Sequence, residues 1–257
     1  MKILHLYPDL MNLYGERANP LMLSFYLQKA GVDVFLEKKN FGEEINFKQY
    51  DVVYIGSGFE SNQKEAAAQL FNYRDEISET IKSGTVFLAT GNSFEIFGRN
   101  IHSETSSYET LGIFDFEVSE QTKERYSSDI IFETEFCSDP VIGCINKCAE
   151  IHGIEDHLFK VNYGIGDFYN SEHEGIRKNN FFGTHVLGPI LVRNPCFLKN
   201  FSDIVLKRIK TDQENEIPSQ EKLKEENLKT GFLNENFENY MRKAYESTLL
   251  KLKSLDP

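Results

Sequence analysis

The stretch Thr85-Val-Phe-Leu-Ala-Thr-Gly-Asn-Ser-Phe-Glu-Ile-Phe-Gly98 decides how this chain is interpreted, because it joins two different patterns through a tight turn. The apolar run Val86–Ala89 predicts a buried strand, and Phe94–Phe97 predicts the start of a helix. A strand that enters a helix through a glycine turn has the geometry of a nucleophile elbow, which aims backbone N–H groups at a developing oxyanion. Here the turn offers Gly91, Asn92 and Ser93, and no cysteine.

This stretch resembles the elbow of the class I glutamine amidotransferases, which reads Cys-Gly-Gly-aromatic-Gln-apolar-apolar-Gly. In that register Gly91 stands at the nucleophile and Glu95 replaces the glutamine. A second block, Phe182-Gly-Thr-His-Val-Leu-Gly-Pro-Ile-Leu191, is similar to the family's Gly-Thr-Tyr-Leu-His-Gly-Pro segment, and Leu187 stands where the general-base histidine would be.

Three further segments resemble the CobB/CobQ-like group, and in particular the GatD subunit of lipid II isoglutaminyl synthase. They are the N-terminal segment Leu6–Pro20, the segment Ile55–Glu60 at the place of the family's Gly-Gly-Gly oxyanion loop, and Leu111–Phe116. The resemblance covers nearly the whole chain. It implies an α/β fold of the flavodoxin-like kind, with a mostly parallel central sheet, helices on both faces, β-hairpin additions and a helical C-terminal tail.

The resemblance also implies a function. A cysteine nucleophile and its base are each nearly useless alone, so the joint change at Gly91 and Leu187 predicts a catalytically degenerate subunit. Family members pair with a Mur-ligase-like, ATP-dependent subunit that amidates the D-glutamate of the peptidoglycan precursor lipid II. The chain has no P-loop, so any ATP chemistry would belong to that partner, and we expect no cofactor in this chain.

Two alternatives stay open at this point. Ser93 and His185 are candidates for a replacement nucleophile and base in an active amide or ester hydrolase, although the sequence favours Ser93 as a helix N-cap and His185 as a structural or partly exposed histidine. The other alternative is a non-catalytic sensor that binds glutamine or a related small molecule in the crevice.

Other candidate site residues follow from the same register. Gly56, Gly58 and Asn92 are expected to form the oxyanion loop. Arg125 aligns with an arginine of the GatD-like subunit that engages substrate, and Glu95 is expected to alter the charge of the substrate crevice, although an exposed arginine and an acidic residue in a first helical turn are also ordinary.

Composition limits the class of protein. The chain has 257 residues, is 40% hydrophobic and carries a net charge of −12, which is typical of a globular protein and argues against binding to nucleic acid or anionic membranes. The sequence shows no signal-peptide core and no run near the roughly 18 apolar residues of a membrane span. We therefore expect a cytoplasmic protein.

The sequence predicts no metal site. Cys137, Cys144, Cys148 and Cys196 form no Cys-x-x-Cys pair, and in a reducing compartment they are expected to be free thiols. Glu172-His173-Glu174 has suitable ligand types, but adjacent strand residues point to opposite faces, so a solvated loop is expected there.

The order of elements follows the same fold. Strands are predicted at Lys2–Tyr7, Asp33–Glu37 and Val52–Ile55, and helices at Asn19–Ala30 and Lys64–Lys82. Short strands are expected later, ending with Thr184–Leu191. We expect an amidotransferase-like domain over residues 1–200. Residues 201–257 should then form a polar linker, centred on Thr211–Glu226, and C-terminal helices that pack on the domain or on a partner.

Overall fold

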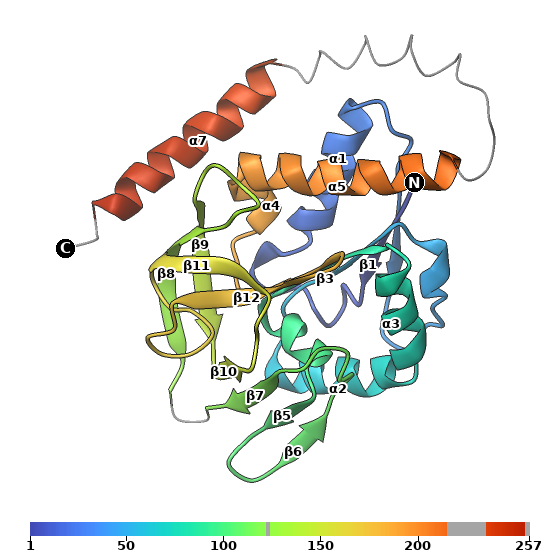
Figure 1. Cartoon of the computed structure of the whole chain (residues 1–257), viewed down its shortest axis with the longest axis vertical. Helices are drawn as coiled ribbons and strands as arrows, with labels where there is room; N and C mark the ends of the chain where they lie inside the picture. Colours follow the sequence, from blue (N-terminus) through green and yellow to red (C-terminus); the bar gives the residue numbers. More distant parts are fainter. Residues whose placement is uncertain (122–123, 215–234, 255–257) are drawn as a thin grey trace.

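A nine-stranded mixed sheet organises the computed structural model, which describes residues 1–121, 124–214 and 235–254 (Figure 1). Five strands at one side run parallel, in the order β2 (Phe35–Lys39), β1 (Lys2–Leu6), β3 (Val52–Ile55), β4 (Val86–Thr90) and β13 (Phe181–Thr184). The antiparallel remainder is β12 (His173–Lys178), β11 (His157–Tyr163), β8 (Tyr126–Glu133) and β9 (Val141–Lys147). The expected α/β fold with hairpin additions is confirmed.

Helices cover both faces of this sheet. α1 (Ala18–Lys29) and α5 (Pro195–Glu214) lie on one face, and α2 (Glu60–Phe71) and α3 (Arg74–Lys82) lie on the other (Figure 1). A second sheet of four short strands packs beside α2, with the order β10 (Ala149–His152), β7 (Glu117–Glu120), β5 (Asn100–His102) and β6 (Ser107–Glu109). The shorter helices are η1 (Leu13–Gly15), η2 (Phe47–Gln49), η3 (Gly91–Phe97) and α4 (Ile190–Arg193).

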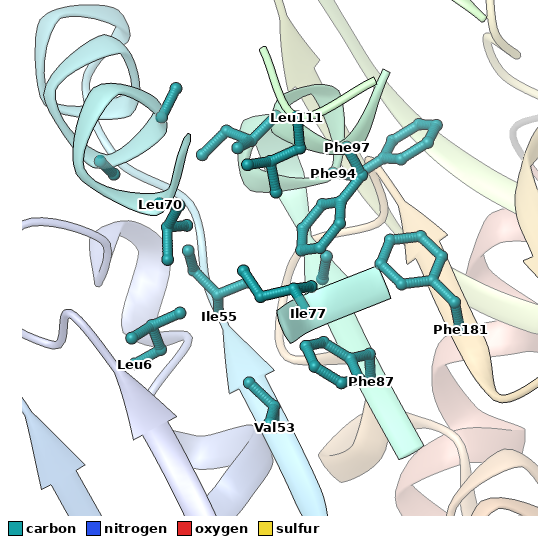
Figure 2. Close-up of a cluster of buried hydrophobic side chains, with 14 of the residues drawn as sticks. Leu6, Val53, Ile55, Leu70, Ile77, Phe87, Phe94, Phe97, Leu111 and Phe181 are labelled. Carbon is teal, nitrogen blue, oxygen red and sulfur yellow. The ribbon is translucent and has the colours of Figure 1, made fainter. Parts of the chain in front are cut away.

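The central strands read as continuous apolar runs because both of their faces are buried. In β3, Val52 and Tyr54 point to the core under α1 and α5, whereas Val53 and Ile55 point to the core under α2 and α3. Figure 2 shows this second core, where side chains of the strands meet those of the helices and of η3. The apolar residues after the glycine turn therefore belong to the core.

Two predicted elements were wrong. Lys64–Lys82 is not one helix, because the chain turns at Asn72–Tyr73 between α2 and α3. Tyr73 is partly buried against the core beneath these helices, and its hydroxyl lies 3.4 Å from the backbone N of Ile45. Thr184–Leu191 is not one strand either, since β13 ends at Thr184, Gly188 has φ +97° and α4 follows.

The C-terminal part begins within a helix, because α5 runs through residue 200 without a break. The predicted linker lies mainly outside the described residues. α7 (Glu235–Lys253) packs its Tyr245 and Leu252 against Ile131 and Ile142 of the antiparallel strands. Among the described helices, none combines the length and apolar character needed to cross a bilayer.

Candidate functional site

The glycine turn after β4 keeps the shape of a nucleophile elbow. β4 passes directly into η3, and Gly91 between them is buried with φ +63°, in the left-handed region that side-chain-bearing residues adopt at a cost. A Cβ atom added to Gly91 would lie 2.5 Å from Ser57 Cβ, 2.6 Å from Ser57 Oγ and 3.0 Å from Leu187 Cδ2. The turn is therefore preserved, and the space that a nucleophilic side chain would need is filled.

The loop after β3 lies beside this turn, because β3 and β4 are parallel neighbours and Ile55 pairs with Ala89. The Asn92 side chain forms two hydrogen bonds with the backbone of Gly58 in this loop. Its Oδ1 accepts from the N–H of Gly58 at 2.9 Å, and its Nδ2 donates to the Gly58 carbonyl at 2.9 Å. Ser57 Oγ donates to the same Oδ1 at 3.2 Å. The Gly58 N–H already has a partner and is not free to stabilise an oxyanion.

Leu187, at the position where the resemblance predicts the general-base histidine, is a buried apolar side chain. It is 1% exposed, and it forms an antiparallel bridge with Cys144, in which Leu187 N donates to Cys144 O at 2.8 Å. Its Cδ2 lies against Gly91. Gly91 and Leu187, the two positions that the resemblance aligns with the nucleophile and the base, thus lie against each other.

The structure does not join Ser93 to His185. Ser93 is fully buried, and its hydroxyl lies 3.0 Å from the Ile55 carbonyl and 2.9 Å from the Thr90 carbonyl. The expectation that Ser93 is a helix N-cap was wrong, since it lies inside η3 and donates to carbonyls, and Thr90 is the N-cap residue. The Ser93 hydroxyl therefore links the ends of β3 and β4 through their backbone carbonyls.

His185 lies between two carboxylates. Its Nε2 is 3.0 Å from Glu95 Oε1, and its Nδ1 is 3.4 Å from Glu174 Oε1, with all three side chains buried. Burial and the charge of Lys147 act to lower the pKa of His185, but its hydrogen bonds to Glu174 and Glu95 outweigh them and raise it. A histidine that holds its proton is a poor general base.

Glu95 and Glu174 belong to a larger buried ionic network. Gln63 of α2 donates to Glu95 Oε2 at 2.7 Å, and Lys147 Nζ donates to the carbonyl of Asp167 at 2.7 Å. The prediction of a solvated loop at Glu172–Glu174 was wrong for Glu174, which lies on β12 and is fully buried, whereas Glu172 precedes the strand and is exposed.

Asp167, Glu174 and His185 offer ligand atoms that all lie within 4.8 Å of one another, which is the spacing of a metal-binding group. Burial lowers the pKa of Lys147, but the charges of Asp167 and Glu174 act on it in the opposite direction, and the pKa of His185 is raised, so both basic groups interact with these carboxylates. We interpret Glu174 and His185 as a buried charged pair that, together with Glu95, connects β12 and the end of β13 to η3.

Glu16 is a site residue that the sequence analysis missed. It is fully buried beside the elbow, where it accepts hydrogen bonds from Tyr54 OH at 3.0 Å and from the Thr90 hydroxyl. Burial raises the pKa of Glu16 to about 7, although hydrogen bonds from Thr90, Tyr54 and the Gly188 backbone oppose the shift. Its place inside the N-terminal segment of the resemblance is the signal that could have found it.

Arg125 lies beside the N-terminus of α2, next to the loop that follows β3. Its Nη1 pairs with Glu60 Oε1 at 2.7 Å, directly after the loop that contains Gly58, and its guanidinium also binds Asn146. The thiol of Cys148 lies 3.3 Å from the same Glu60 oxygen. Burial, together with the Glu60 charge, raises the pKa of Cys148 to about 12, so this thiol stays protonated and is no substitute nucleophile.

Comparisons with known proteins agree on one relationship. The sequence profile of the CobB/CobQ-like glutamine amidotransferase domain matches residues 2–195. The chain is 29% identical over 224 residues to the lipid II isoglutaminyl synthase (glutamine-hydrolyzing) subunit GatD of Streptococcus pneumoniae, covering 86% of each chain. It is 28% identical over 195 residues to the same subunit of Staphylococcus aureus, covering 76% of this chain and 79% of that protein.

Solved structures show the same fold at lower identity. PurLQS from Thermotoga maritima matches with a TM-score of 0.55 and 12% identity, covering 82% of this chain and 98% of that chain. A glutamine amidotransferase matches with a TM-score of 0.53 and 13% identity, covering 79% and 98%.

Proposed function

Because its residues 2–195 match the CobB/CobQ-like glutamine amidotransferase domain, the chain belongs to that family, and we propose that it is a member that has lost glutamine hydrolysis. The observation that carries this proposal is the filled elbow. A side chain at Gly91 has no room beside Ser57 and Leu187, and a thioester intermediate cannot form without a nucleophile.

The rest of the site supports the same conclusion. Hydrolysis of an amide needs free N–H donors aimed at the oxyanion, and removal of one such donor typically costs about 10²–10³ in rate. Here Asn92 holds the N–H of Gly58, so the oxyanion site is closed as well as the nucleophile position.

We further propose that the protein acts as the non-hydrolysing subunit of a complex that amidates the D-glutamate of lipid II. Two relatives at 29% and 28% identity are subunits of lipid II isoglutaminyl synthase, and the similarity covers most of each chain. The partner in this proposal is a Mur-ligase-like, ATP-dependent subunit, which this chain stabilises or regulates. The ligase would then take free ammonium as its nitrogen source.

The first test is an assay of glutamate and ammonia release from glutamine by the purified chain, alone and together with the Mur-ligase-like protein of the same organism. The S. pneumoniae GatD subunit, assayed with its own ligase, is the positive control. We expect no release above the no-enzyme rate in either state. Glutamine-dependent release above the no-enzyme rate would overturn the proposal, and Ser93→Ala and Cys148→Ser variants would then show whether either side chain is the nucleophile.

The second test uses nitrogen isotopes to separate the two sources of ammonia. Lipid II, ATP and the complex are incubated either with amide-labelled ¹⁵N-glutamine or with ¹⁵N-ammonium, and the amidated product is measured by mass spectrometry. We expect label from ammonium alone, and faster amidation with this chain than with the ligase by itself. Equal rates with and without the chain would refute the role in the complex. Thermal stabilisation by glutamine without release would point instead to a sensor.

A further inference from the structure

Two cysteines that are far apart in the sequence meet on the side of the sheet covered by α5. Cys137 lies in the turn that follows β8, and Cys196 is the second residue of α5. Both are free thiols that line the same cavity, and each lies close enough to the other to shift its pKa. This pair lies outside the elbow and takes no part in the function proposed above.

Hydrogen-bond donors surround the sulfur of Cys196. Ser138 Oγ lies 3.6 Å from it, and Asn200 Nδ2, one turn further along α5, lies 3.9 Å from it. The backbone N–H groups of Ser138 and Asp139 and the thiol of Cys137 also donate to it. The position at the N-terminus of a long helix adds the positive end of the helix dipole.

The surroundings of the two thiols shift their pKa values in opposite directions. Burial acts to raise the pKa of Cys196, but the hydrogen bonds from Asp139, Ser138 and Cys137 outweigh it, and the net shift is downward. Burial raises the pKa of Cys137 far above its usual value, and the neighbouring Cys196 adds to that shift. The pair therefore combines one thiol whose pKa is lowered with one whose pKa is raised.

The pair is accessible to a small reagent. Both cysteines are only partly buried, and both line a cavity of about 740 Å³ that α5 and α7 share. Met241 and Arg242 of α7 line the same cavity, and Arg242 Nη1 binds Asp139 at 2.7 Å. Cys144 and Cys148 differ from Cys196, because burial raises the pKa of both.

We propose that Cys196 and Cys137 form a peroxide-reactive dithiol site, with Cys196 as the attacking thiolate and Cys137 as the resolving thiol. The Cys196 sulfur attacks one oxygen of a hydroperoxide, the O–O bond breaks, and the leaving hydroxide takes a proton to become water, which leaves Cys196 as a sulfenic acid. The Cys137 sulfur then attacks the sulfenic sulfur, the S–O bond breaks, and the thiol proton leaves with the oxygen as a second water. The product is a Cys137–Cys196 disulfide, and hydrogen peroxide is the oxidant, which is reduced to water.

The test uses the full-length reduced chain and compares each thiol with the others. Alkylation by iodoacetamide at pH 7, followed by peptide mass spectrometry, should label Cys196 at least about threefold faster than Cys144 or Cys148. Treatment with hydrogen peroxide should then give a Cys137–Cys196 disulfide in the wild-type protein. A Cys137→Ser variant should stop at the sulfenic acid, trapped at Cys196 as its dimedone adduct.

Matched controls keep the outcome clear. Cys144→Ser is the control variant, since Cys144 is also partly buried, and it should leave both the disulfide and its rate unchanged. Cys196→Ser should abolish oxidation at Cys137. Melting temperatures of all variants are measured first, so that loss of reaction is not confused with unfolding. Equal alkylation rates at all four cysteines, or peroxide oxidation spread evenly among them, would overturn the proposal.

Discussion

A methyl group added at Gly91 should destabilise the protein for two reasons that can be measured separately. In the left-handed region, a side chain costs about 1–2 kcal/mol. The new Cβ would also lie 2.5 Å from Ser57 Cβ, and overpacking of a buried site typically costs about 1–3 kcal/mol. We therefore expect Gly91→Ala to lower the free energy of unfolding by about 2–5 kcal/mol and the melting temperature by about 4–20 °C.

The structure provides a control for each contribution. Gly31 has φ +85° and no atom within 4 Å of an added Cβ, so Gly31→Ala should show the backbone cost alone. Ser57→Gly removes the atoms that the new methyl group would meet. In a urea-denaturation cycle, the cost of Gly91→Ala should therefore be smaller by about 1–3 kcal/mol in the Ser57→Gly background.

Two results would refute this reasoning. If Gly91→Ala costs no more than Gly31→Ala, the space beside Gly91 is not filled. If Ser57→Gly leaves the cost of Gly91→Ala unchanged, Ser57 is not the obstacle.

The remaining predictions concern three other contacts. Burial raises the pKa of Glu16 to about 7, above its ordinary 4.5. The free energy of unfolding should therefore fall by about 3 kcal/mol as pH rises between these values. Glu16→Gln should remove that part of the pH dependence of the free energy of unfolding in urea titrations at several pH values, and an equal pH dependence in both proteins would contradict the assignment. Arg125→Ala breaks a half-exposed pair with Glu60 and should cost only about 0.2–1 kcal/mol, so a loss above about 2 kcal/mol in the same assay would show a larger structural role. Tyr245→Phe removes the 2.7 Å hydrogen bond to the Pro140 carbonyl and should cost about 0.5–1.5 kcal/mol. Faster amide exchange confined to α7 would be its signature, and unchanged exchange would show that α7 docks without this bond.

Much of the fold could be predicted because its signals are local. Apolar runs such as Val52–Ile55 and Val86–Ala89 identify strands buried on both faces, and the glycines that follow them mark their ends. The errors arose where tertiary contacts decide. The turn at Asn72–Tyr73 places Tyr73 in the core, and a helical pattern in the sequence does not show that.

The site was predictable only in part for the same reason. The resemblance aligned Gly91 and Leu187 with the nucleophile and the base, but the packing of Ser57 against Gly91 depends on the adjacency of β3 and β4. Glu174 was expected in a solvated loop because adjacent strand residues point to opposite faces, whereas the partners that permit its burial come from the end of β13 and from the residue that follows it. Glu16 was overlooked because a lone acidic residue in the sequence carries no sign that Tyr54 and Thr90 will surround it.

The two hydrogen bonds between the Asn92 side chain and the Gly58 backbone bear on whether glutamine hydrolysis could be restored by substitution. Under the function proposed above, a cysteine introduced at Gly91 alone would not restore glutamine hydrolysis, because its side chain would collide with Ser57 while the N–H of Gly58 stayed bound to Asn92. A return of the reaction would therefore need coordinated substitutions at several of the positions Gly91, Ser57, Asn92 and Leu187, and no single reversion is expected to bring it back.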